Sequence, residues 1–194
     1  MIRNISMKIT DIMYGRNLLK SDELDMFCYG MEIIISSIIN VGMIIAISLT
    51  TRKLMFGIIF LLFIIPIRMI TGGFHAKTYI CCSLVFSVSF VLALLFNEYF
   101  SENYYKYIGL INCISSICYF RFSPMENRFK PLTDFQIKTF KTASTFIFLI
   151  GGFFGIIFNK NCFIKELSII LLIVTILFFL GKGEQNYEKG HNGY

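Results

Sequence analysis

The sequence predicts an all-α integral membrane protein, with about six transmembrane helices preceded by an amphipathic interfacial helix. Three observations predict this fold class. Of the 194 residues, 56% are hydrophobic and 15% are charged, and the mean hydropathy is +0.69. Charge-free stretches recur along the chain, and Lys and Arg gather in alternate connections between them. A soluble fold of this length cannot hide so much apolar surface from water, so we expect the bilayer to be its solvent.

The N-terminal segment, residues 1–20, is expected to form the interfacial helix. Ile2, Ile5, Ile9 and Ile12 fall on one helical stripe, whereas charged and amide side chains fall on the opposite one. Such a helix can lie in the headgroup region of the inner leaflet. A helix packed on the cytoplasmic end of the bundle would show the same pattern, so both interpretations stay open.

Charge-free stretches define the transmembrane bundle, which we expect over residues 21–181. A span needs about 20 predominantly apolar residues. Three stretches approach or reach that length, namely 33–51, 78–97 and 142–159. Three more are shorter, namely 54–67, 107–120 and 167–181. The shorter stretches either cross the bilayer with the help of long flanking side chains or turn back inside it. We predict six spans; the alternative is four spans with re-entrant segments.

Two polar segments complete the organisation. Pro124 and Pro131 prevent one continuous helix over 121–141, so we predict a polar loop there. Residues 182–194 are polar and rich in Gly, which predicts a disordered cytoplasmic tail.

The positive charges orient the bundle. With six spans, thirteen of the 18 Lys and Arg residues fall on the side of the termini and five on the other side. The positive-inside rule therefore places both termini, and the segment 68–82 discussed below, on the cytoplasmic side of the membrane. The net charge of +6 follows from this bias. No basic run with interleaved aromatic residues marks a nucleic-acid groove, so we expect membrane lipid and not nucleic acid as a partner.

One acidic residue, Glu32, lies about two turns inside the first predicted span. An acid at that depth typically marks a functional or pairing site. Near the end of a helix, its carboxylate could equally reach headgroup water.

The segment 68–82 carries the best candidates for chemistry. His75 is one of two histidines, and Cys82 follows it seven residues later. On one continuous helix these side chains would be about 10.5 Å apart along the axis, too far for proton transfer. The chain around His75 must therefore fold back before a helix starts, which Gly72 and Gly73 permit. First-turn backbone N–H groups of that helix could then stabilise a thiolate or an oxyanion.

Simpler interpretations of these residues exist. A membrane Cys is most often a small apolar filler, and a His at a membrane boundary is often an interfacial polar group. The six cysteines lack the paired loop spacing of a disulfide framework, so most are expected to be free thiols. The sequence offers no second well-placed His and no C-x-x-C motif. We therefore expect neither a metal nor another cofactor.

The motif T-G-G-F-H-A-K with a Cys seven residues after the His, and the later segment S-P-M-E-N-R-F-K-P over 123–131, resemble the accessory gene regulator B (AgrB) family. Its members are membrane cysteine endopeptidases of peptide quorum sensing in Gram-positive bacteria. The resemblance implies that His75 is the catalytic histidine and that Cys82, rather than Cys81, is the nucleophile. The implied substrate is an AgrD-like precursor peptide, which is cut through an acyl-thioester and closed to a thiolactone or lactone ring.

Supporting roles for other residues rest on weaker arguments. Glu126 and Asn127 could orient His75 if their loop folds under the site. Arg68 and Lys77 could attract the acidic tail of the precursor, or could be ordinary positive-inside flanks.

Two questions stay open at this stage. Gly151, Gly152 and Gly155 in the fifth span allow close helix approach, which would serve either a homodimer, as the family suggests, or packing within one bundle. A competing function is a non-enzymatic small membrane transporter or accessory subunit that binds a peptide or an ion. In such a protein Glu32, and not Cys82, would be indispensable.

Overall fold

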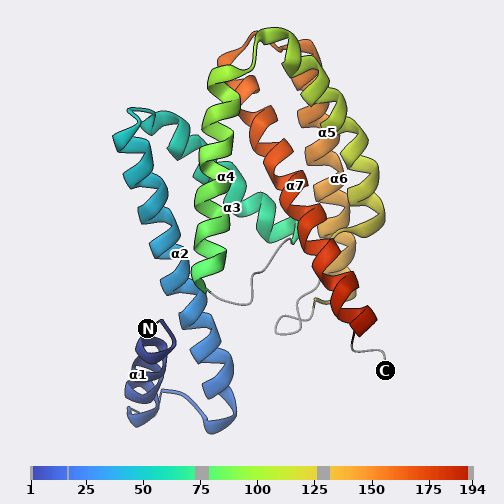
Figure 1. Ribbon diagram of the computed structural model, residues 1–194. Helices are drawn as coiled ribbons and strands as arrows, with labels where there is room; N and C mark the ends of the chain where they lie inside the picture. The colour runs from blue at the N-terminus through green and yellow to red at the C-terminus, as the bar shows by residue number, and fades with distance from the viewer. Residues whose placement is uncertain (1, 17, 73–78, 126–131, 192–194) are drawn as a thin grey trace.

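The computed structural model describes residues 2–16, 18–72, 79–125 and 132–191, and its described elements are helical (Figure 1). The elements are α1 (Ile2–Gly15), a 3₁₀ turn (Ser21–Glu23), α2 (Leu24–Thr50), α3 (Leu54–Thr71), α4 (Tyr79–Tyr99), α5 (Glu102–Phe122), α6 (Asp134–Ile157) and α7 (Cys162–His191). The all-α class predicted from the sequence is confirmed.

The six long helices run alternately up and down between two ends of the bundle (Figure 1). At one end α2, α4 and α6 begin, α3, α5 and α7 end, and α1 lies beside the start of α2 (Figure 1). We refer to this as the α1 end, and to the other as the opposite end. α1 and the last turns of α7 thus share one end, as an even number of crossings requires.

Five of the six long helices are long and apolar enough to cross a membrane. They are Ser21–Thr50, Leu54–Thr71, Ile80–Tyr99, Asp134–Ile157 and Cys162–Gly183. The remaining long helix, α5, carries Glu102, Lys106 and Arg121. The chain is therefore a multi-pass membrane protein, with five candidate spans by helix length and composition.

The packing of α5 bears on the sixth predicted span. Ser144 Oγ of α6 donates to Ser123 Oγ, just after the end of α5, over 3.0 Å. Towards the opposite end, the backbones of Gly109 and Gly152 are in contact. α5 therefore lies antiparallel beside α6 and at the same depth. The three shorter stretches all form parts of continuous helices, α3, α5 and α7, which favours six spans over re-entrant segments.

Two predicted boundaries differ from the structure. The polar loop predicted over 121–141 is shorter, because α5 ends at Phe122 and α6 begins at Asp134. A capping box starts α6 early: the Gln136 N–H donates to Thr133 Oγ1 over 3.3 Å, and the Thr133 N–H donates to Gln136 Oε1 over 3.0 Å. The tail predicted over 182–194 is helical as far as His191, because a helix nucleated in the last span propagates at little cost where no Pro stops it.

Aromatic side chains fill the core in two groups. Phe60 of α3 packs against Phe90 of α4 with ring centroids 5.0 Å apart. Tyr119 of α5 stacks on Phe148 of α6 at 4.0 Å and contacts Phe178 of α7 at 4.5 Å. The aromatic-rich composition thus provides the large apolar surfaces that hold the helices together.

The glycines of α6 serve packing within one bundle. Gly151, Gly152 and Gly155 are all buried. A Cβ atom on Gly152 would lie 2.7 Å from the Gly109 carbonyl oxygen, and one on Gly155 would lie 2.7 Å from Ser168 Oγ. The Gly151–Gly155 spacing is therefore used by α5 and α7, and a homodimer would need another surface.

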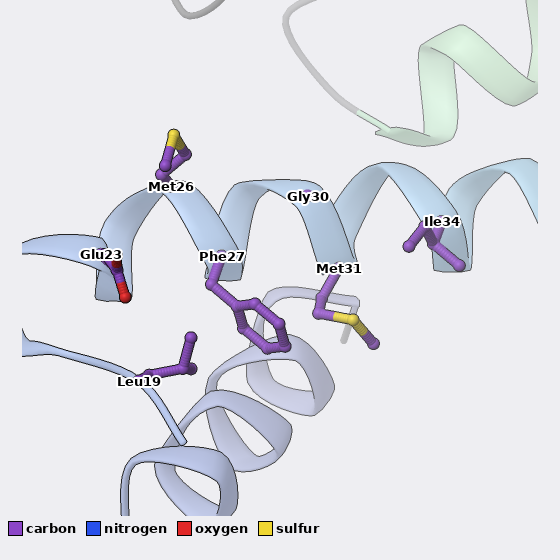
Figure 2. A pocket seen from close by; sticks show the side chains of 7 residues that line it. All are labelled: Leu19, Glu23, Met26, Phe27, Gly30, Met31 and Ile34. Carbon is purple, nitrogen blue, oxygen red and sulfur yellow. The ribbon is translucent and has the colours of Figure 1, made fainter. Parts of the chain in front are cut away.

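The N-terminal helix packs on α2, and it keeps part of its apolar stripe outside. Ser6 and Thr10 of α1 are buried, whereas Ile5 and Ile12 are 41% and 56% exposed. A pocket of about 350 Å³ is lined by Leu19 and by residues of α2, of which Phe27 and Met31 point towards α1 (Figure 2). α1 thus combines both predicted features, a docked face and an exposed apolar face suited to the membrane surface.

Candidate active site

Helix α3 ends at the α1 end of the bundle in a conformation that requires glycine. Gly72 has φ 71° and ψ −165°, a region that essentially only glycine adopts. The Gly72 N–H donates to the Arg68 carbonyl over 3.0 Å, and Thr71 is fully buried. The chain therefore leaves the helix abruptly at the first of the paired glycines.

The segment after α5 docks against this helix end. The Met125 N–H donates to the Thr71 carbonyl over 3.1 Å. A Cβ atom on Gly72 would lie 2.7 Å from the Met125 carbonyl oxygen and 2.9 Å from Met125 Cβ, so no larger residue fits. This contact, which we call the Thr71–Met125 junction, brings together the two sequence motifs 68–82 and 123–131, although α4 and α5 separate them along the chain.

Buried hydroxyl groups hold the start of this segment in place. Ser123 is 6% exposed, its N–H donates to the Tyr119 carbonyl over 2.9 Å, and its Oγ accepts the hydrogen bond from Ser144 Oγ. Sequence reasoning did not identify Ser144 or Met125. The Ser-Pro start of the loop motif was the available signal, and it gave no indication of the partner helix.

The candidate nucleophile lies in the first turn of α4. α4 begins at Tyr79, close to the start predicted after the paired glycines. Cys82 is half-buried, whereas Cys81 is exposed. The two adjacent thiols therefore have different surroundings, and Cys82 is the one that is partly shielded. First-turn N–H groups of a helix lack helical partners and favour a thiolate.

The positively charged side chain of Arg68 lies near Cys82. Arg68, in the last turn of α3, is half-buried, and its guanidinium interacts electrostatically with the Cys82 thiol. Arg68 is thus more than a remote positive flank, because it lies near Cys82 and one helical turn before Thr71.

Glu32 is buried within the bundle. It is 9% exposed and lies on the same face of α2 as Ser36. Ser87 Oγ of α4 lies 4.0 Å from Met43 Sδ of α2, and these two helices run in the same direction. Cys82 precedes Ser87 by five residues, whereas Glu32 precedes Met43 by eleven. At 1.5 Å per residue, Glu32 therefore lies about 9 Å nearer the α1 end than Cys82.

The remaining predicted site residues lie outside the described residues: Gly73, His75, Lys77, Glu126 and Asn127. The structure describes their neighbours, Gly72 and Met125, which are in contact.

Two pockets are mainly apolar and are lined by none of the candidate site residues. One is the pocket lined by Leu19 and α2 described above (Figure 2). The other, of about 570 Å³, is a groove between α3, α6 and α7 whose wall includes Pro66, Ile67 and Ile70, next to Arg68. Within the described segments, no three His, Cys, Asp or Glu side chains gather to hold a metal ion.

Comparison with known proteins gives one match. Residues 6–181 match the family model described as Accessory gene regulator B, which covers nearly the whole chain. No curated protein and no solved structure matches the chain.

Proposed function

Because the chain belongs to the accessory gene regulator B (AgrB) family, whose members are peptidases that process AgrD in peptide quorum sensing, we propose that it is a cysteine endopeptidase with Cys82 as nucleophile and His75 as acid–base. Its substrate is an AgrD-like precursor, cut between the signal core and the acidic C-terminal tail. The termini and the site lie on the cytoplasmic side of the membrane, as the distribution of Lys and Arg indicates.

The proposed reaction has two acyl-transfer steps. The Cys82 thiolate attacks the scissile carbonyl carbon, a C–S bond forms, the C–N bond breaks, and His75 gives a proton to the leaving amine. A thiol or hydroxyl group of the substrate core then attacks the acyl-thioester, and Cys82 leaves as a thiolate. Exchange of one thioester for another is nearly isoenergetic, so ring closure competes with hydrolysis only where water is restricted.

The difference between the two adjacent thiols is the observation that carries the proposal. Cys82 is half-buried and interacts electrostatically with Arg68, whereas Cys81 is exposed. Partial burial restricts the access of water to the thiol and to an acyl-thioester formed on it. These features support Cys82, the residue seven positions after His75, as the nucleophile.

The Thr71–Met125 junction supports a composite site. Met125 immediately precedes Glu126 and Asn127, and Thr71 precedes Gly72, which starts the segment that holds His75. We propose that Glu126 or Asn127 orients the histidine, as a third group does in catalytic triads.

Co-expression with the AgrD-like precursor tests the proposal. We expect Cys82→Ala and His75→Ala each to abolish release of the precursor tail, while membrane content of the protein is unchanged. Cys81→Ala is the matched control, since it removes one thiol from the same helical turn, and we expect it to retain processing. Tail release by the Cys82→Ala variant would contradict the assignment.

Trapping of the intermediate gives direct evidence. With a precursor that lacks the ring-closing thiol or hydroxyl, an acyl adduct should accumulate on Cys82, identifiable by mass spectrometry of the tryptic peptide 78–106. An adduct on Cys81 instead would move the nucleophile by one position and leave the reaction class intact.

A further inference from the structure

Two cations share one aromatic ring at the α1 end of α5 and α7. Lys182 Nζ of α7 lies 2.6 Å from the centroid of the Phe122 ring, and Arg121 Cζ lies 5.8 Å from it. The charges of Arg121 and Lys182 are close enough to repel each other. We call Arg121, Phe122 and Lys182 the cation pair site.

Among the described side chains, no carboxylate neutralises this pair. Among the side chains that the structure describes, none of the Asp or Glu carboxylates lies within 4.0 Å of Arg121 or Lys182, whereas at the opposite end Lys165 pairs with Glu102 at 2.9 Å. Two like charges held together without a counter-charge provide strong attraction for an anion.

The cation pair site lies at the edge of the apolar surface. Leu110, Ile114 and Ile117 of α5 are 48%, 63% and 69% exposed. At 100° per residue these side chains and Arg121 fall on one stripe about 60° wide. Arg121 is therefore the polar end of a lipid-facing stripe. Lys182 similarly precedes Gly183, the last residue of the apolar span of α7.

We propose that Arg121 and Lys182 bind the headgroup phosphate of an anionic phospholipid, whose acyl chains lie along the Leu110–Ile114–Ile117 stripe. Phe122, 41% exposed, fixes the Lys182 ammonium at the height of the headgroups. Basic residues between transmembrane helices at a membrane boundary are typical of such lipid sites. This inference does not depend on the proposed peptidase activity.

The apolar stripe distinguishes a lipid from other anions. An acidic peptide or free phosphate would use the two charges and would leave the exposed stripe unused. A phospholipid fits both features, because its phosphate can contact Arg121 while its acyl chains extend along the apolar stripe of α5. We therefore expect preference for an anionic lipid over a zwitterionic one of the same chain length.

Native mass spectrometry of the detergent-purified full chain tests the proposal. Phosphatidylglycerol and phosphatidylcholine with identical acyl chains are added together, and the ratio of their adducts is measured. We expect the wild type to retain phosphatidylglycerol preferentially, and Arg121→Gln or Lys182→Gln to lower this preference about fivefold each, as the loss of one basic contact predicts. Lys106→Gln with Lys160→Gln is the matched control, since these exposed cations at the opposite end carry the same charge.

Further arms separate the possible anions and control for misfolding. Arg121→Lys and Lys182→Arg keep the charge, and should keep the preference even if the Gln variants fail to fold. A wild type without preference, or Gln variants with unchanged preference, would overturn the proposal. A short poly-glutamate peptide and inorganic phosphate are also tested as competitors in phosphatidylcholine nanodiscs. If either displaces phosphatidylglycerol and its binding requires Arg121 and Lys182, the site recognises the charge alone and the proposal is overturned.

Discussion

Substitution of Gly72 by Ala is the most direct test of the Thr71–Met125 junction. The backbone of Gly72, with φ 71° and ψ −165°, costs an L-residue about 1–3 kcal/mol. The added methyl group would lie 2.7 Å from the Met125 carbonyl oxygen and 2.9 Å from Met125 Cβ. Overpacking of this kind costs about a further 1–3 kcal/mol. If the junction is kept, the variant therefore loses about 2–6 kcal/mol.

The chain can avoid part of this cost by giving up the hydrogen bond from Met125 to Thr71. The segment 123–125 then no longer sits against the end of α3, so we expect precursor processing to fall together with stability. Thermal unfolding in detergent, followed by circular dichroism, should show a Tm at least about 4 °C lower, since about 1 kcal/mol corresponds to about 2–4 °C in a chain of this size. Tail release from the co-expressed precursor gives the functional readout.

Gly42→Ala is the matched control. Gly42 lies within α2, and a Cβ atom there would meet no atom within 4 Å. Ala is a better helix former than Gly by about 1 kcal/mol, so this variant should keep or raise the Tm and retain processing. If Gly72→Ala behaved like Gly42→Ala in both assays, the argument for a fixed junction between α3 and the loop would be wrong.

Three further predictions concern packing, the thiol and the buried acid. Gly152→Ala should lower the Tm by several degrees at any protein concentration, because the added methyl group would meet the backbone of α5 within one chain. Gly42→Ala should not lower the Tm. A shift of the Tm that depends on protein concentration would instead indicate a dimer contact. Arg68→Gln should slow release of the precursor tail and Arg68→Lys should restore it, since the positive charge of Arg68 lies near the Cys82 thiol; equal rates in all three proteins would count against a role for this cation. Glu32→Gln keeps the shape of the side chain and removes its charge, so we expect processing to fall while the Tm changes little, and full processing by this variant would show that the buried carboxylate is not needed.

The class of the fold was accessible from the sequence because it depends on composition and local pattern. Charge-free stretches the length of a bilayer predict helices, and Cys82 was identified by its fixed step from His75. The boundaries of the helices were harder to predict from the sequence. Pro124 and Pro131 predict a loop, whereas the capping box of Thr133 and Gln136 starts helix α6 shortly after Pro131. The length of the loop therefore depends on where the capping box takes effect.

Sequence alone could not say what the glycines of α6 touch. The spacing of Gly151 and Gly155 fits any close helix contact, within one chain or between two. Which surface they meet depends on how α5 and α7 pack, and the structure assigns them to Gly109, Leu171 and Ser168.

By itself, therefore, the sequence determined the membrane environment, the helical class, the charge asymmetry and the candidate nucleophile, because each depends on neighbouring residues or on periodic patterns. Only the tertiary structure decided that the loop after α5 meets the end of α3, that Cys82 is partly buried near Arg68, and that Glu32 is buried within the bundle. The physical reason is that each of these features arises where one helix or loop packs against another. Their proximity depends on helix packing, register and the φ angle of Gly72, which no local pattern specifies.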